Sequence, residues 1–262
     1  MSTPTIHISL TSISSRMATV DRTLRSLINQ DYGNLVVHLY LSKEPHLLDE
    51  GVPEVPKKVQ DLITETDGKL QVHYTKNIGP YRKLLPLLFS YWGQELLVVT
   101  ADDDTIYPTN WLRTLYHHYG KYNCCIAFRG HRIIAKNDKF LPYRSWMKDA
   151  IFENPSSLIL PTGKDGIFYN SAMFPETVMN ISEALRLAPT ADDIWFRWNL
   201  ALNGVPVFVI ETDYKTTFEE STYQSSLYFN YNRGGQNDTI VNAVDLHFKK
   251  HKSFNLLKDS GI

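Results

Sequence analysis

Two groups of acidic residues have the types and spacing to do chemistry. The first, Asp102-Asp103-Asp104, follows an apolar run from Glu95 to Thr100 and precedes Pro108. Three adjacent carboxylates repel one another unless a cation or solvent neutralises them. Hard carboxylate oxygens suit Mg²⁺ or Mn²⁺, which usually bridge to substrate phosphates. The triplet therefore predicts a divalent-metal site, with an acidic surface loop as the alternative.

The second group, Asp192-Asp193, opens a helix predicted from Ala191 to Asn203. The spacing Thr190-x-x-Asp193 is that of a capping box, and acidic side chains suit the positive start of a helix. A carboxylate in a pocket can also act as a general base. Because one carboxylate can cap while the other works, the two interpretations are compatible.

Basic and glycine residues lie near these acids in the predicted order of elements. Lys83, with Arg82 before it, follows the turn Asn77–Pro80, and a lysine offsets the charge of a diphosphate as a point charge. A solvated basic turn is the alternative. Gly163 and Gly166 precede a short strand, where glycine lets the backbone approach a ligand closely, unless the segment is an ordinary turn.

Strand and helix patterns alternate four times in the first 120 residues. Strands are predicted at Thr5–Thr11, Leu35–Leu41, Leu70–Tyr74 and Glu95–Thr100; helices follow a cap at Ser14-Ser15, span Pro56–Thr66 and Tyr81–Trp92, and start at Pro108. This alternation is typical of a parallel, doubly wound α/β sheet. Ligands bind such sheets beyond the carboxyl ends of the strands, where the three aspartates are expected to lie.

The second half is less regular. Strands are predicted at Cys124–Phe128, His131–Ala135, Gly166–Tyr169 and Val205–Glu211, around a long irregular segment Pro142–Pro161, and a last helix is predicted with Asn237-Asp238 as its cap. With no internal repeat or linker, the prediction is a single domain over residues 1–262.

Composition excludes several classes of protein. The 27 basic and 28 acidic residues balance, so a nucleic-acid binder is not expected. Cys124 and Cys125 are adjacent in an apolar run, which favours buried thiols in a reducing compartment over a disulfide. The start, Met1–His7, lacks the features of a signal peptide, and no apolar run is long enough to span a bilayer. We therefore expect a cytoplasmic protein, which could still contact the inner face of a membrane.

The buried strand, D-D-D, Tyr107-Pro108 and the Trp111-Leu112 helix together resemble the D-x-D region of GT-A glycosyltransferases. Within that group the chain is most similar to family-2-like bacterial polysaccharide enzymes. The resemblance covers nearly the whole chain, because Thr11–Arg16 and Leu27–Tyr32 match the usual start of the family. It implies a GT-A fold, that is, a Rossmann-like, mostly parallel sheet flanked by helices, with a nucleotide-binding half over 1–120 and an acceptor-binding half over 121–262.

The resemblance also implies roles for individual residues. Asp104, with Asp102, would hold Mn²⁺ or Mg²⁺ on the donor diphosphate. Asp193 matches the catalytic base of inverting members, with Asp192 as the alternative. The implied donor-binding residues are Thr11, Ser12, Arg16, Asn77, Lys83, Asp102, Asp103 and Gly166. Arg233 could reach phosphate from the loop Asn232–Asp238, whereas His247 is not expected among the metal ligands.

The implied activity is metal-dependent transfer of a sugar from a nucleotide-diphosphate sugar, with UDP as the expected nucleotide, to a glycan or lipid-linked acceptor hydroxyl. A sugar nucleotidyltransferase is one alternative. Such an enzyme is expected to have a glycine-rich loop after the first strand, whereas Thr11–Arg16 contains no glycine. A non-catalytic glycan-binding or assembly domain is the other, and the intact acidic groups count against it.

Overall fold

The computed structural model describes residues 3–210, 217–218 and 226–259. Its main sheet has seven strands in the order β12-β6-β11-β4-β1-β2-β3. Their bounds are β1 Ile6–Thr11, β2 Leu35–Leu41, β3 Leu70–Tyr74, β4 Leu97–Thr100, β6 Cys125–Ala127, β11 Ile167–Asn170 and β12 Val207–Val209. All neighbours are parallel except β11, which runs antiparallel to both β4 and β6. The predicted α/β class with a mostly parallel sheet is therefore confirmed.

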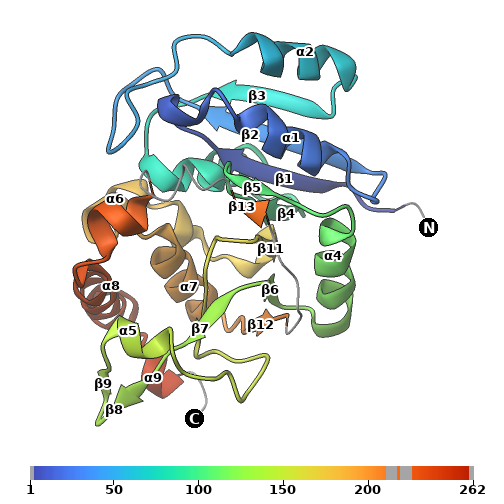
Figure 1. Cartoon of the computed structure of the whole chain (residues 1–262). Coiled ribbons are helices and arrows are strands. Elements are labelled where there is room, and N and C mark those ends of the chain that lie inside the picture. The colour runs from blue at the N-terminus through green and yellow to red at the C-terminus, as the bar shows by residue number, and fades with distance from the viewer. Residues whose placement is uncertain (1–2, 211–216, 219–225, 260–262) are drawn as a thin grey trace.

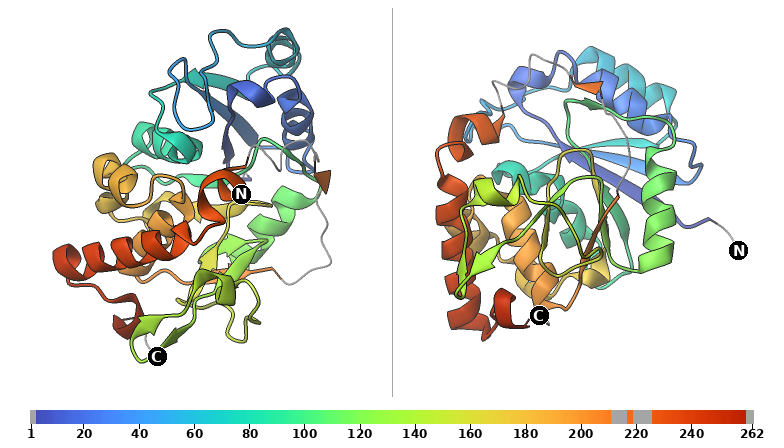
Figure 2. Two further views of the ribbon diagram at one scale, coloured as in Figure 1. Left: turned by 60° about the vertical axis from the view of Figure 1, so that its left-hand side comes forward. Right: turned by 60° about the horizontal axis from the view of Figure 1, so that its bottom comes forward.

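Helices cover both faces of this sheet, giving three layers (Figures 1 and 2). One apolar core joins the sheet to α1, α2 and α4, and the other joins it to α3, α6, α7 and α8. The bounds are α1 Val20–Ile28, α2 Lys57–Glu65, α3 Leu85–Ser90, α4 Trp111–Tyr122, α6 Ile181–Leu187, α7 Asp192–Leu202 and α8 Gln236–Lys252. Because strand side chains alternate between faces, Cys124 belongs to the first core and Cys125 to the second. Both thiols are buried and free, as the sequence predicts.

Shorter elements complete the fold. They are the helical turns η1 Ser14–Arg16, η2 Gly79–Lys83, η3 Ser171–Met173, η4 Glu176–Met179, η6 Tyr228–Asn232, α5 Tyr143–Trp146 and α9 Leu256–Asp259. Three two-stranded ribbons pair β5 Thr105–Ile106 with β13 Thr217–Phe218, β7 Gly130–Arg132 with β10 Ile159–Pro161, and β8 Ala135–Lys136 with β9 Lys139–Phe140.

Three predicted helix starts are displaced in the structure, among them that of α4, which begins at Trp111 rather than at Pro108. The Ser14-Ser15 cap is wrong, because these residues form η1 and the helix begins only at Val20. Ser14 is used elsewhere: its amide donates to Asp49 Oδ1 at 3.0 Å, which ties the loop after β2 to the end of β1. Further on, α3 begins at Leu85 rather than at Tyr81, as expected if Pro86 sits in a first turn where its missing N–H costs nothing.

Side-chain caps predicted for α7 and α8 are also wrong. The Thr190 hydroxyl donates to Asn232 Oδ1 at 2.7 Å instead of capping α7. The last helix begins at Gln236, after Gly235 with its φ of 97°, and Asp238 accepts a hydrogen bond from the Tyr143 amide. In each case a long-range partner has replaced the local cap, and sequence spacing does not reveal such partners.

The second half contains more regular structure than the sequence suggests. The segment Pro142–Pro161 holds α5 and β10, and the strand predicted at His131–Ala135 is divided between β7 and β8. Helix α6 was not predicted. Glu211, the predicted end of the last strand, lies outside the described residues.

A row of histidines crosses β1, β2 and β3. His7 Nδ1 lies 2.9 Å from His38 Nε2, and His38 Nδ1 lies 3.0 Å from His73 Nε2. The central ring is only 3% exposed. Burial, with smaller contributions from His7 and His73, lowers the pKa of His38 to about 3. All three rings can hydrogen-bond as neutral imidazoles, each donating through one nitrogen and accepting through the other.

Across the described part of the chain, no helix is both long and apolar enough to cross a membrane.

Candidate active site

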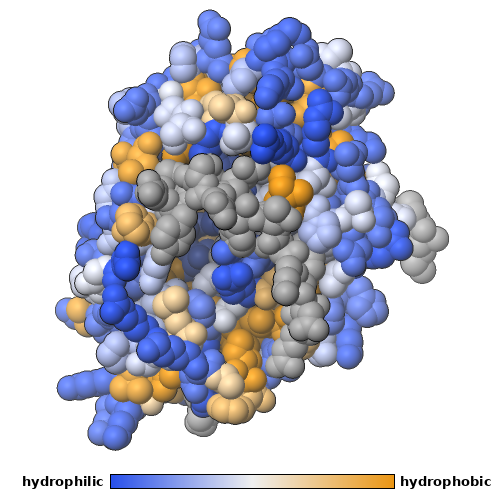
Figure 3. All heavy atoms as spheres, in the orientation of Figure 1, coloured by the Kyte–Doolittle hydropathy of each residue, from blue (hydrophilic) through white to orange (hydrophobic). Residues whose placement is uncertain are grey.

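A cavity of about 580 Å³ opens at the carboxyl ends of β1 and β4. Figure 3 shows a hollow in the middle of one face, with hydrophilic and hydrophobic side chains around it. Both halves of the chain line the cavity. Of the residues predicted for the site, it is lined by Thr11, Ser12, Arg16, Lys83, Asp102, Asp103, Asp104, Asp192 and Asp193. The two acidic groups, far apart in sequence, therefore share one pocket.

The three aspartates after β4 have different surroundings. Asp103 is 5% exposed, and its carboxylate accepts hydrogen bonds from Ser12 Oγ and Arg16 Nη1. Arg16 Nη2 also lies 3.3 Å from Asp104 Oδ2. The single charge of Arg16, from η1, is thus shared between two carboxylates, and Asp103 also accepts the Ser12 hydroxyl. Asp103 is engaged within the protein, whereas Asp102 and Asp104 have more exposed side chains, at 31% and 16%.

Asp102 and Asp104 are the carboxylates that fit a divalent cation. Burial raises the pKa of Asp102; the nearby Lys83 ammonium opposes this, and the Asp104 charge adds to it. Two like charges close enough to perturb each other favour a shared cation. Among the residues that the structure describes, no three His, Cys, Asp or Glu side chains are arranged to hold a metal by themselves. The pair therefore suits a cation such as Mg²⁺ that takes its other ligands from phosphate and water.

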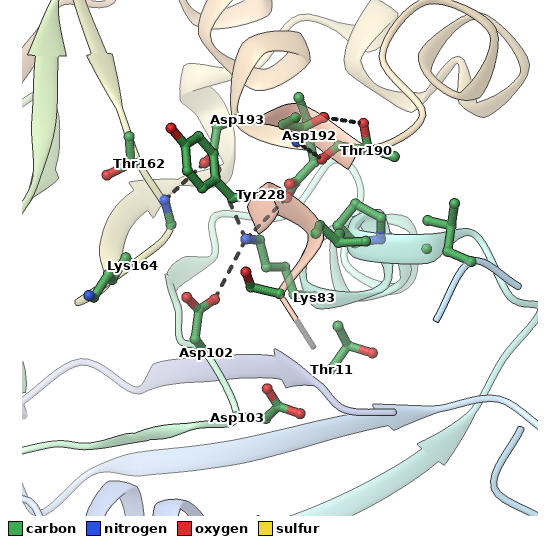
Figure 4. A pocket seen from close by; sticks show the side chains of 18 of the residues that line it. Thr11, Lys83, Asp102, Asp103, Thr162, Lys164, Thr190, Asp192, Asp193 and Tyr228 are labelled. Atoms are coloured by element: carbon green, nitrogen blue, oxygen red, sulfur yellow. Dashed lines mark hydrogen bonds and ion pairs between the residues drawn. The ribbon is translucent and has the colours of Figure 1, made fainter. Parts of the chain in front are cut away.

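Lys83 joins the two acidic groups. Its ammonium lies 3.2 Å from Asp192 Oδ2, 3.8 Å from Asp102 Oδ1 and 4.0 Å from Asp193 Oδ1 (Figure 4). The side chain comes from η2, where it is 8% exposed. Burial alone would lower the pKa of Lys83, but the three carboxylates outweigh it and raise the pKa. Lys83 is therefore a fixed cation between Asp102 and the pair at the start of α7.

Asp193 is held at the first turn of α7 by a loop from the other side of the pocket. Gly163 N–H donates to Asp193 Oδ2 at 3.0 Å, and Oδ1 has no hydrogen-bond partner. Burial raises the pKa of Asp193 to about 7; Lys83 opposes the rise, and Asp192 adds to it. A carboxylate that titrates near neutral pH is suited to accept a proton from a substrate.

Arg82 and Asn77 hydrogen-bond to the loop after β2, which forms one wall of the pocket. The Arg82 guanidinium is 1% exposed and donates to Asp49 Oδ2 at 2.9 Å. Asn77 donates to the same carboxylate oxygen at 3.2 Å and to Glu44 O at 2.7 Å. Asn77 is not among the lining residues, so the structure gives it a role in fixing the loop after β2. The sequence carries no signal that Asp49 is the centre of this network.

Gly166 also lies behind the pocket surface rather than on it. A Cβ at this position would come within 2.5 Å of the Trp111 ring, and the φ of 103° favours glycine. Trp111 Nε1 donates to Asp165 O at 2.7 Å, and Asp165 accepts two hydrogen bonds from Arg129. Gly166 therefore allows the loop to pack on α4.

Several lining residues escaped the sequence analysis. They are His46, Asp49, Arg129, His131, Tyr143, Met147, Thr162, Tyr228 and Asn237, whereas Gly163, named there for close approach to a ligand, does line the pocket. Burial lowers the pKa of His131 to about 4, so its ring, 5.8 Å from that of Tyr143, is neutral at pH 7. Arg233 and His247, which the sequence analysis also considered, do not line this pocket. Arg233 stacks on Phe229, and His247 lies 3.4 Å from Glu183 in a separate cavity of about 220 Å³.

Some buried polar atoms of the pocket lining have no hydrogen-bond partner, and their chemical element differs between the two halves of the chain. Within the described residues, those from the first half include the nitrogens His46 Nε2 and Arg82 Nη1. Those from the second half include the oxygens Thr162 Oγ1, Asp193 Oδ1 and Asn237 Oδ1. A buried polar group left unpaired costs about 1–3 kcal/mol, so each is a place for a complementary ligand group.

No protein-family model matches the chain, and no curated protein matches it in sequence. Solved structures do match it in fold. The Staphylococcus aureus TarS 1–349 structure in complex with UDP-GlcNAc superposes with a TM-score of 0.53 at 16% identity, over 97% of this chain and 74% of that one. The 4-diphosphocytidyl-2C-methyl-D-erythritol synthase of Anaerococcus prevotii gives a TM-score of 0.50 at 15% identity, over 88% of this chain and 96% of that one. At these identities the likeness shows the fold alone, a single α/β domain with a mostly parallel sheet.

Proposed function

We propose that this protein is a glycosyltransferase that moves a sugar from a nucleoside-diphosphate donor, with UDP as the expected nucleotide, to an acceptor hydroxyl. The observation that carries the proposal is the shared pocket. It brings Asp102 and Asp104, which suit a metal-bound diphosphate, to one side of Lys83, and Asp192-Asp193 to the other. The likeness in fold to a structure in complex with UDP-GlcNAc supports a nucleotide-sugar donor.

The unpaired nitrogens and oxygens of the pocket lining support a placement for the donor and the acceptor. Unpaired nitrogens at His46 and Arg82 suit the oxygen-rich nucleoside diphosphate. Unpaired oxygens at Thr162, Asp193 and Asn237 suit the hydroxyl groups of a glycan or lipid-linked sugar. The donor is therefore proposed to lie against the first half of the chain and the acceptor against the second.

In the proposed reaction the acceptor oxygen displaces the nucleoside diphosphate directly. Asp193 takes the proton from the attacking hydroxyl, and a single displacement inverts the anomeric centre. Arg16 and Lys83 hold positive charge on the donor side. A divalent cation held by Asp102 and Asp104 would offset the charge of the leaving diphosphate.

A thermal-shift screen of nucleotides and nucleotide sugars, with and without Mn²⁺, tests the proposal directly. A ligand that binds the native state raises the melting temperature. At a concentration a hundred times its Kd, it adds about 2.7 kcal/mol to the free energy of unfolding. We expect UDP or a UDP-sugar to give the largest rise, and the best donor to be turned over when acceptor glycans are added. No shift with any nucleotide sugar would contradict the proposal.

A sugar nucleotidyltransferase is the second candidate, because the fold is also similar to that of the 4-diphosphocytidyl-2C-methyl-D-erythritol synthase. A nucleotidyltransferase is expected to have a glycine-rich loop after the first strand. In this chain the loop after β1 contains no glycine and forms η1, with Arg16 bound to Asp103. The two activities are separated by product: the second would release pyrophosphate from a nucleoside triphosphate and a sugar phosphate. Pyrophosphate release without transfer from a nucleotide sugar would favour it.

A further inference from the structure

In the segment Thr162–Gly166, which follows β10, the residues Thr162, Gly163 and Lys164 line the pocket. The backbone of this segment is fixed at both ends, since Thr162 N–H donates to Arg129 O at 3.0 Å and Gly166 N–H donates to Gly163 O at 3.2 Å. Between these bonds, Gly163 N–H donates to Asp193 Oδ2. Gly163 is absent from the glycines with positive φ, so its backbone does not need glycine. What favours glycine at position 163 is therefore the lack of room for a Cβ.

The space in front of Gly163 is filled by the Lys83 ammonium. A Cβ at position 163 would lie 2.5 Å from Lys83 Nζ, 3.3 Å from Asp193 Oδ1 and 3.7 Å from Lys83 Cε. The first distance is a severe overlap, and the last is ordinary contact. Because Nζ is the end of a flexible side chain, it would move while the backbone stayed in place. A methyl group at position 163 would thus displace the ammonium from its three carboxylates.

On this basis we propose that Gly163 is a positioning residue: it leaves the room in which Lys83 sits between Asp102 and Asp192-Asp193, and its amide holds Asp193. The inference rests on the proposed function for its catalytic consequence. Without the ammonium, three carboxylates from two walls of the pocket would face one another uncompensated, and like charges at this separation repel. Lys83 therefore acts as an internal counter-ion that Gly163 keeps in place.

A double-mutant cycle tests this directly, with Gly163→Ala, Lys83→Met and the double variant. Methionine ends where Lys Cε lies, so it has no atom at the 2.5 Å overlap and meets the added Cβ in ordinary contact. We expect Gly163→Ala to lower kcat by about 10-fold or more, and the same change to have almost no effect once Lys83 is Met, since contacting residues couple this strongly. The donor KM should change less than kcat. Gly33→Ala is the matched control, because an added Cβ there meets nothing within 4 Å.

Equal losses from Gly163→Ala in both backgrounds would overturn the proposal, because Gly163 would then act independently of Lys83. So would wild-type kinetics in Gly163→Ala. The same cycle measured by urea unfolding needs no activity: Gly163→Ala should lower the midpoint in the Lys83 background and not in the Met background. If the wild-type protein turned over no nucleotide sugar, the proposed function would fail, and the unfolding cycle would still decide whether Gly163 makes room for Lys83.

Discussion

Asp193 is bound on one side only: its Oδ2 accepts the Gly163 N–H at 3.0 Å, while Oδ1 has no hydrogen-bond partner and Lys83 Nζ stands 4.0 Å away. Asp192, its neighbour, is nearer the ammonium, with Oδ2 at 3.2 Å. The neighbours thus have different surroundings. One carboxylate is paired with a cation, and the other keeps an oxygen available for a substrate proton.

Substitution by asparagine should separate the two. We expect Asp193→Asn to lose at least about 10²-fold in kcat, because the amide cannot accept the proton, while melting near wild type and still binding nucleotide. Asp192→Asn should lose less rate. Kinetics and thermal melts must be measured on the same preparations. If Asp192→Asn is inactive and Asp193→Asn is active, the roles are exchanged; if both are active, the inverting mechanism is wrong.

The rate should depend on pH through Asp193. Burial raises the pKa of its carboxyl to about 7 from the usual 3.8, and the base works only when deprotonated. The kcat should therefore rise as pH increases through about 7 and level off above it. Asp193→Asn, assayed at higher enzyme concentration, should lack this rise. A wild-type profile that is flat between pH 5.5 and about 8.5 would argue against Asp193 as base.

Metal dependence follows from Asp102 and Asp104. We expect EDTA to abolish transfer and Mn²⁺ or Mg²⁺ to restore it, since the two carboxylates and a diphosphate together supply oxygen ligands for a hard cation. Asp104→Asn should weaken both activity and the thermal shift that UDP gives with metal. Asp149→Asn, which changes a carboxylate paired with Arg132, outside the pocket lining, is the control. Full transfer in excess EDTA would remove the metal from the mechanism.

Asn237 should report on the acceptor. It lines the pocket from the first turn of α8, is 6% exposed, and its Oδ1 is unpaired. Asn237→Leu is expected to raise the acceptor KM by about 5- to 30-fold, the effect of a lost hydrogen bond of about 1–2 kcal/mol, and to leave the donor KM and the rate of donor hydrolysis unchanged. A rise in the donor KM instead would place the acceptor elsewhere.

Stability should fall in acid because of the histidine row. The pKa of His38 is lowered to about 3 in the folded chain from 6.5, so the unfolded chain binds the proton more readily between these values. The neutral His38 ring therefore costs no stability above pH 6.5, and the free energy of unfolding falls as the pH falls from 6.5 toward 3. By pH 5 the loss is about 2 kcal/mol. Urea unfolding from pH 7.5 to about 5 should show a shallower pH slope in His38→Gln than in wild type. The exposed His117→Gln should keep the wild-type slope.

The sequence alone determined the fold class and the acidic groups. Alternating and continuous apolar runs such as Leu35–Leu41 are local signals, because a strand or helix buries residues at a fixed period. The order of these elements, with the right-handed connection of parallel strands, places Asp102 to Asp104 at a strand end. Pro86 lies in the first turn of α3, and its effect on the start of that helix is also local.

Tertiary structure decided which side chains meet. Thr190 and Asp193 have the spacing of a cap, yet Thr190 binds Asn232, 42 residues away, and Asp193 binds the Gly163 amide. The Asp49–Arg82 ion pair and the place of Lys83 likewise join segments that are distant in sequence. Such contacts depend on how the loops at the sheet edge pack together. Composition and periodicity report only on each residue's own element, so the two acidic groups could be found in the sequence, but their meeting around one lysine could not.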